Sequence, residues 1–204
     1  DELPPEARIY LMDGVGGKTA VVGVSPDFAM TRMDDEQHPE CDLYVEDPRA
    51  ATLVSEILVK ADRDLLSRAK LIPFGAASVG LALGIMAQQK RFPRPSLVFL
   101  DGDQAAAPGC IVLPGEDAPE RVVFDSLRTI GWPDVAARIG RGPAETIDAL
   151  NAAMALGDHH DWIRNSGDRL TIGGDILWQA LASSWASNCA TVEQIELVAQ
   201  AVRD

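Results

Sequence analysis

The sequence predicts an α/β protein in which a parallel sheet is flanked by helices, and three observations carry that prediction. Short apolar runs alternate with helical patterns at a spacing of about 25 residues, as successive βαβ units produce. Two of these runs end directly in acidic residues, at Glu46 and at Asp101. After residue 117 the apolar spacing is helical only, which predicts a C-terminal helical lobe. The predicted strands of the sheet cover 43–45, 70–74, 97–100 and 110–113.

Near the N-terminus, two β-rich runs at 8–13 and 18–25 flank a glycine-rich link, and this pattern predicts a β-hairpin. The triplet at 17–19 (Gly-Lys-Thr) also suggests a phosphate-binding P-loop. That loop requires a further glycine where Met12 stands, and it leads into a helix, whereas the residues after the triplet are strand-like. The sequence therefore favours a plain turn at this place.

Helix signals follow the first two strands of the predicted sheet. Asp47 suits an N-cap, and Pro48 suits the first position of a helix, because a missing N–H has no helical partner there. The helix predicted over 78–89 contains Gly80 and Gly84, which indicate close packing against the sheet. The apolar stripe of the first helix comprises Ala51, Val54, Ile57, Leu58 and Ala61.

Caps and apolar spacing also predict the helical lobe. Asp117 can cap one helix, Pro143 begins another, and two more cover 173–187 and 191–203. The inward positions of the first are Val122, Val123, Leu127 and Ile130. We therefore divide the chain into an N-terminal hairpin and connector, a catalytic core and a helical lobe. Their ranges are 1–41, 42–130 and 131–204.

Composition places the chain among globular proteins. It is 47% hydrophobic and 24% charged, and its net charge of −13 argues against a generic basic nucleic-acid binder. A nuclease remains compatible with that charge, because an acidic site presents metal ions to phosphate. No apolar run reaches the length of a bilayer span, so no membrane partner is expected. Three widely spaced cysteines and an acidic, proline-rich start favour the cytoplasm.

The acids at the strand ends are the main candidate site residues. Parallel strands present their carboxyl ends at one edge of the sheet, so neighbouring strands would bring Glu46 beside Asp101 and Asp103. Carboxylates gathered at one edge repel each other unless a cation lies between them, and carboxylate oxygens suit Mg²⁺. The alternative is a strand that simply ends in an Asp-Gly turn. We favour metal binding.

Glu46 on one strand and the Asp101-Gly102-Asp103 segment on another resemble the Toprim domain of topoisomerases, primases and OLD (overcoming lysogenization defect) nucleases. The segment 113–120 is similar to the stretch that follows the Toprim core in the OLD family. The resemblance implies a Toprim-like Rossmannoid sheet and a DNA endonuclease that uses one or two Mg²⁺ or Mn²⁺ ions. It makes Glu120 a ligand of the second ion. It also implies an ABC-type ATPase domain N-terminal to this chain, a homodimer, and a role in phage defence or DNA repair.

Several residues keep two interpretations. Glu120 lies three residues after Asp117, so it is either a helix-capping partner or the second-ion ligand. Ala50 stands where the OLD family often carries a second acid. The family's late lysine is absent here, and Arg164 or Arg169 would have to replace it. The pair His159 and His160 lacks a supporting zinc constellation in the sequence, which favours surface or lobe-core histidines.

Three functional hypotheses therefore remain. The first is a metal-dependent endonuclease in which Glu46, Asp101 and Asp103 hold an ion. The second is a catalytically weak Toprim scaffold that binds DNA or a protein partner. The third is a phosphotransfer or hydrolase domain that uses a nucleophilic aspartate, which the separate acidic strand at Glu46 disfavours. Metal-dependent cleavage of plasmid DNA separates the first hypothesis from the second.

Overall fold

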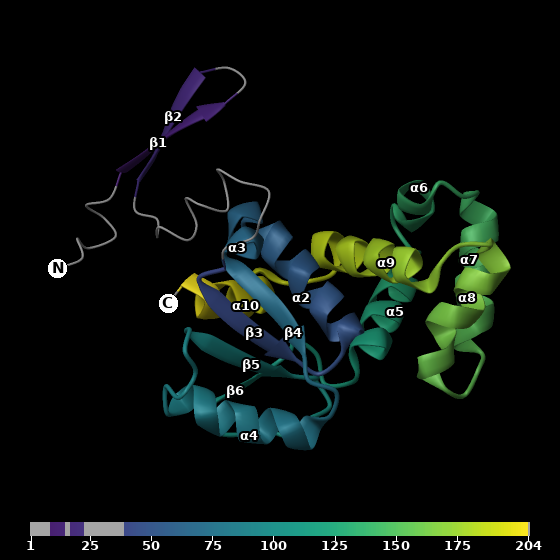
Figure 1. Ribbon diagram of the computed structural model, residues 1–204. Coiled ribbons are helices and arrows are strands. Elements are labelled where there is room, and N and C mark those ends of the chain that lie inside the picture. The colour runs from purple at the N-terminus through teal and green to yellow at the C-terminus, as the bar shows by residue number, and fades with distance from the viewer. Residues whose placement is uncertain (1–8, 15–16, 23–38, 204) are drawn as a thin grey trace.

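The computed structural model describes residues 9–14, 17–22 and 39–203, and its centre is a four-stranded sheet in which every pairing is parallel. The strands are β3 (Cys41–Val45), β4 (Ala69–Pro73), β5 (Ser96–Leu100) and β6 (Cys110–Val112). They lie in the order β4-β3-β5-β6 (Figure 1). The predicted α/β class and all four predicted strands are confirmed.

The direction in which successive strands are added to the sheet reverses at the β3–β5 pair. The chain enters the sheet at β3, adds β4 on one side, and then crosses to the other side for β5 and β6. Leu43 pairs with Leu97 and Tyr44 with Val98, so continuing the register brings Glu46 beside the end of β5. Open α/β sheets bind their ligands in the crevice outside such a reversal point.

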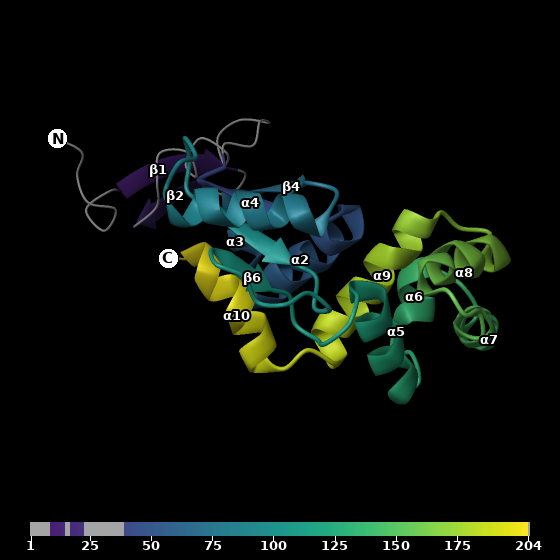
Figure 2. The ribbon, with the colours of Figure 1, turned by 90° about the horizontal axis from the view of Figure 1, so that it is seen from below.

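Helices cover both faces of the sheet (Figures 1 and 2). On one face lie α2 (Pro48–Ala61), α3 (Arg63–Arg68) and α10 (Val192–Arg203). On the other lies α4 (Ala77–Gln88), which joins β4 to β5. The connection from β3 to β4 and the connection from β4 to β5 run across the sheet in opposite directions. When both crossovers are right-handed, their helices therefore lie on opposite faces of the sheet.

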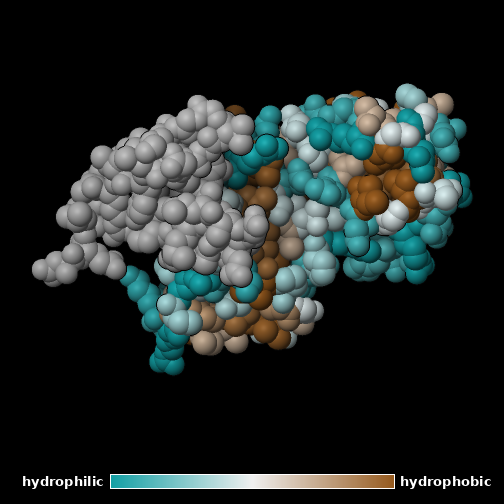
Figure 3. All heavy atoms as spheres, turned by 45° about the horizontal axis from the view of Figure 1, so that its top comes forward, coloured by the Kyte–Doolittle hydropathy of each residue, from teal (hydrophilic) through white to brown (hydrophobic). Residues whose placement is uncertain are grey.

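Close packing of α4 on the sheet depends on its two glycines, as the sequence predicted. A Cβ atom at Gly80 would lie 2.7 Å from a methyl carbon of Leu100, and one at Gly84 would lie 2.3 Å from the Cys110 sulfur. The opposite side of α4 is apolar and exposed (Figure 3). The large exposed side chains there are Val79, Leu81, Ile85 and Met86.

The C-terminal region is helical, as predicted, and shares its core with the sheet. Its elements are α5 (Pro119–Thr129), α6 (Val135–Ile139), α7 (Pro143–Met154), the 3₁₀ turn η2 (His159–Asp161), α8 (Trp162–Leu170) and α9 (Gly174–Asn188). One continuous cluster of buried residues joins the sheet helices to this region, with α9 packed on both α2 and α5. Phe124 contacts Trp132 and Trp162 within that cluster.

The predicted N-terminal hairpin is also confirmed. Strands β1 (Ile9–Gly14) and β2 (Gly17–Val22) pair antiparallel, with Gly14 opposite Gly17. The acidic connector predicted after the hairpin covers 34–41, and residues 34–38 of it lie outside the described residues. Within the described part of the chain, every helix falls short of the length and apolar character that crossing a bilayer requires.

Candidate metal centre

Glu46 and Asp101 follow neighbouring parallel strands, so the prediction that they share one edge of the sheet is confirmed. Glu46 Oε2 and Asp101 Oδ1 are both buried, and neither has a hydrogen-bond partner within the described residues. Buried carboxylate oxygens are rarely left unpaired, because a lost hydrogen bond to a charged group costs several kcal/mol. Two such oxygens lie at the reversal point of the sheet, and a bound cation is one group that would satisfy both.

The carboxylates at this edge destabilise each other's charged forms. Burial raises the pKa of Asp101 to about 8, and the charge of Glu46 is the next largest cause. Burial also raises the pKa of Glu46, followed by the charges of Asp103 and Asp47. The backbone N–H of Ala77, at the start of α4, donates to Glu46 and opposes that rise. Gathering these acids in their charged forms is therefore unfavourable in the metal-free protein, and Asp101 keeps its proton up to about pH 8.

These groups fit Mg²⁺ or Mn²⁺. Both ions prefer carboxylate oxygens, and a divalent cation would satisfy the unpaired oxygens of Glu46 and Asp101 while cancelling their repulsion. The three acids are not gathered around one point, because the ligand atoms of Glu46, Asp101 and Asp103 do not all lie within 4.8 Å of one another. Asp103 is exposed and accepts a hydrogen bond from Gln104 Nε2 at 2.8 Å. Its side chain would have to rotate to join the ion.

Gly102 fixes the geometry between the two aspartates. A Cβ atom there would lie 2.7 Å from the carbonyl oxygen of Gly115 and 2.8 Å from that of Asp117. The loop before α5 therefore packs directly on the Asp-Gly-Asp backbone. Gly75, with φ of +96°, donates its N–H to the Glu46 carbonyl at 2.7 Å and places the start of α4 beside that residue.

Asp47 has the capping role that the sequence predicted. Its carboxylate accepts hydrogen bonds from the N–H groups of Arg49 and Ala50, both at 2.8 Å, and Pro48 opens the helix. Ala50 is fully buried in the core. The position where the OLD family often carries a second acid thus supplies no ligand here.

Glu120 does not cap α5, so that interpretation is wrong. The N-cap is Ala118, whose methyl side chain accepts no hydrogen bond, and Asp117 accepts the N–H of Ala118 at 2.8 Å and pairs with Arg121 at 3.7 Å. Glu120 is 4% exposed, and its Oε1 forms an ion pair with the guanidinium of Arg49. A carboxylate in the first turn also interacts favourably with the helix dipole. Any metal ion that Glu120 binds would therefore lie next to the positive charge of Arg49.

Arg49 is the basic residue at this site, and the sequence interpretation missed it. Its carbonyl accepts a hydrogen bond from Trp178 Nε1 at 2.9 Å, and its guanidinium donates to the His160 carbonyl at 3.4 Å. The one signal in the sequence was its place three residues after Glu46, in the first helical turn. The expected alternatives lie elsewhere: Arg164 pairs with Asp161, and Arg169 bonds Asn165.

The two late histidines lie next to Glu120. The Nδ1 atom of His160 is 3.9 Å from Glu120 Oε1, and the rings of His159 and His160 lie 4.0 Å apart. Burial lowers the pKa of His159, and the neighbouring His160 lowers it further. Of the described residues, Asp158, His159 and His160 form the one trio of potential metal ligands within 4.8 Å. The carboxylate of this trio is Asp158, which directly precedes the two histidines in the sequence.

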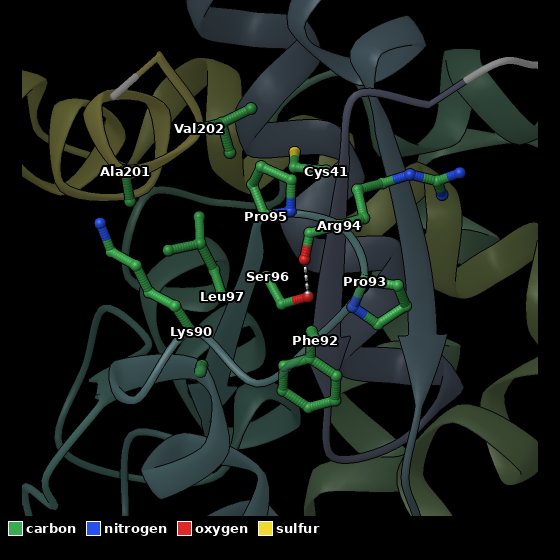
Figure 4. A pocket seen from close by; sticks show the side chains of 11 residues that line it. Cys41, Lys90, Phe92, Pro93, Arg94, Pro95, Ser96, Leu97, Ala201 and Val202 are labelled. Atoms are coloured by element: carbon green, nitrogen blue, oxygen red, sulfur yellow. Dashed lines mark hydrogen bonds between the residues drawn. The ribbon is translucent and has the colours of Figure 1, made fainter.

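A separate cavity of about 500 Å³ lies at the opposite end of the sheet, where β3 and β5 begin (Figure 4). Among the described residues, its lining includes Cys41, Lys90 and Arg94 but no carboxylate. Burial raises the pKa of the Cys41 thiol to about 11, which keeps it protonated, and Arg94 is paired with Asp42 at 3.0 Å. The lining that the structure describes therefore offers neither a hard metal ligand set nor an activated nucleophile.

Comparisons with protein-family models, with curated proteins and with solved structures find no match for the chain. The function has to be inferred from the strand-end acids.

Proposed function

We propose that this chain is a divalent-metal-dependent endonuclease domain that hydrolyses DNA phosphodiester bonds. The observation that carries the proposal is the pair of buried, unpaired oxygens on Glu46 and Asp101 at the reversal point of the sheet. The resemblance of these acids and of segment 113–120 to the Toprim domain of OLD nucleases supports the choice of substrate.

The residues have distinct roles in this proposal. Glu46 and Asp101 hold one Mg²⁺ or Mn²⁺ ion, and Asp103 joins them after rotation. Glu120 contributes a carboxylate oxygen to a second ion, and the same carboxylate also pairs with the guanidinium of Arg49. Bound ions supply an activated water and neutralise charge on the leaving oxygen. If only one ion is present, Glu46, with its raised pKa, takes the proton from the attacking water.

The wider setting is proposed on the resemblance alone. An ABC-type ATPase domain preceding this chain in the intact cytoplasmic protein would supply dimerisation and control, with a role in phage defence or DNA repair. The net charge of −13 requires bound cations, or basic surfaces of that other domain, to bring the DNA phosphates close.

Cleavage of supercoiled plasmid DNA tests the proposal. The chain is incubated with plasmid in Mg²⁺, in Mn²⁺ and in chelator, alongside Asp101→Asn and the control Asp42→Asn. Asp42 lies at the start of β3, at the other end of the strand from Glu46, and an asparagine there can still accept a hydrogen bond from Arg94. We expect metal-dependent cutting by the wild type and by the control, and none by Asp101→Asn. Equal cutting by both variants would refute the assigned site.

A catalytically weak scaffold that binds DNA or a protein partner is the second candidate. It is favoured by the open arrangement of the three acids and by the engagement of Glu120 with Arg49. Retardation of DNA in a gel without cleavage in Mn²⁺, unchanged in Asp101→Asn, would select this function over hydrolysis.

A further inference from the structure

We propose that Asp158, His159 and His160 form a second, separate metal site that takes a borderline transition ion such as Zn²⁺, Co²⁺ or Ni²⁺, with Glu120 on its inner side. The strand-end acids favour hard cations, whereas this trio offers imidazole nitrogens. The inference stands independently of the proposed nuclease activity.

Geometry is the first argument. One ligand atom from each of the three residues lies within 4.8 Å of the others. Bonds of 2.0–2.2 Å to a tetrahedral ion place ligand atoms roughly 3.4 Å apart, so the trio needs only a small contraction. The side chains of Asp158 and His160 are 61% and 67% exposed, which leaves them free to rotate and leaves the site open to an ion from solvent.

A second argument is the unsatisfied ring of His159. Its Nε2 atom is buried and has no hydrogen-bond partner among the described residues. The ring is held in place by its neighbours, at 4.0 Å from the His160 ring and 6.2 Å from that of Trp162. A buried imidazole nitrogen without a hydrogen-bond partner is uncommon, and histidine binds zinc-type ions through either ring nitrogen.

The chemistry of the donors selects the ion. Two imidazoles and one carboxylate, with an open fourth position, are a common ligand set for zinc and related ions, whereas Mg²⁺ prefers oxygen ligands and retains its waters. Glu120 Oε1 lies 3.9 Å from His160 Nδ1 and can supply a further carboxylate oxygen. The Asp158 carboxylate already orders the turn that carries the histidines, because it accepts a hydrogen bond from the His160 N–H at 3.0 Å.

This position also links the helical region to the strand-end acids. Glu120 forms an ion pair with Arg49, whose guanidinium also donates to the His160 carbonyl at 3.4 Å. An ion at the histidines would share the Glu120 carboxylate with Arg49. His160 therefore lies 3.9 Å from the same carboxylate that the proposed nuclease uses for its second ion.

Co²⁺ titration of the full chain, purified without a polyhistidine tag, tests the inference. Tetrahedral Co²⁺ bound to imidazole gives intense visible absorption, and Zn²⁺ then competes for the site in calorimetry. One variant is the double substitution His159→Gln and His160→Gln. The other is Asp158→Asn, whose side-chain oxygen can still accept the hydrogen bond from the His160 N–H. Controls are Asp101→Asn, which alters the strand-end acids, and His38→Gln, which removes the third histidine of the chain.

We expect wild type, Asp101→Asn and His38→Gln to give the same tetrahedral Co²⁺ absorption, which saturates at one equivalent with equal affinity. Loss of a direct ligand should weaken binding by more than the about 10-fold to 100-fold that loss of a supporting hydrogen bond costs. An unchanged Co²⁺ spectrum in the histidine double variant and in Asp158→Asn would overturn the inference, as would its loss in Asp101→Asn. A chain that shows the expected binding but cuts no DNA would keep this site and refute the nuclease.

Discussion

Replacing Asp101 with asparagine isolates the electrostatic cost that the strand-end acids impose on the metal-free protein. Burial and the charge of Glu46 raise the pKa of Asp101 from 3.8 to about 8. Between those values the folded protein holds a proton that the unfolded chain has released. The stabilising contribution of that proton is complete below the lower value and is lost as the pH rises through the upper one. Asparagine carries no charge and should remove this slope.

The size of the effect follows from the pKa difference. Each pKa unit corresponds to about 1.4 kcal/mol, so the full difference amounts to about 6 kcal/mol. Asp101 is only partly buried, and solvent screening should reduce the measurable gain to about 1–3 kcal/mol. The gain should shrink as the pH falls toward about 5, because the folded carboxyl is then protonated.

Urea unfolding in chelator, at about pH 5 and about pH 9, measures this gain. Asp148→Asn serves as the control, since Asp148 is an exposed acid in the middle of α7. Saturating Mg²⁺ should reverse the order, because a ligand at about 100 times its Kd stabilises the wild type by about 2.7 kcal/mol. A metal-free Asp101→Asn that is less stable than wild type at about pH 9 would identify Asp101 as a structural hydrogen-bond acceptor and refute the reasoning.

Three further variants test the surroundings of the site. Gly102→Ala brings a methyl group within 2.7 Å of a backbone carbonyl oxygen, and urea unfolding should show a loss of about 1–3 kcal/mol; Gly157→Ala, with open space around it, should be near neutral. Trp178→Phe removes the indole N–H that donates to the Arg49 carbonyl and should lower stability by about 1 kcal/mol, a loss that an unchanged melting temperature would contradict. Glu120→Gln weakens a charge-assisted bond to a guanidinium that is 31% exposed, and should cost about 1–2 kcal/mol; a double-mutant cycle with Arg49→Met should show coupling, and strictly additive losses would argue against the ion pair.

The placement of Glu46 beside Asp101 could be predicted because it depends on local patterns. Each acid ends a short apolar strand, and alternating strands and helices imply parallel pairing, which brings carboxyl ends to one edge. Gly80 and Gly84 likewise indicated close packing, since a missing side chain in an apolar helix permits a close approach to the sheet. These features needed no knowledge of distant contacts.

The contacts of Glu120 could not be predicted in the same way. Its partner Arg49 is 71 residues away, and His160 comes from a short turn in the helical region. The spacing from Asp117 suggested a cap, but the helix begins one residue too late for Asp117 to be the N-cap. Helix α8 was also missed, because its buried positions include Ser166 and Gly167, which carry no apolar signal.

Anomalous diffraction from crystals soaked in Mn²⁺ tests the central claim most directly. The account predicts a manganese peak between the carboxylates of Glu46 and Asp101, with Asp103 rotated toward it and away from Gln104. A parallel crystal of Asp101→Asn should lack the peak. Carboxylates that bind only water or each other in saturating Mn²⁺, with no peak at the edge of the sheet between β3 and β5, would contradict the account.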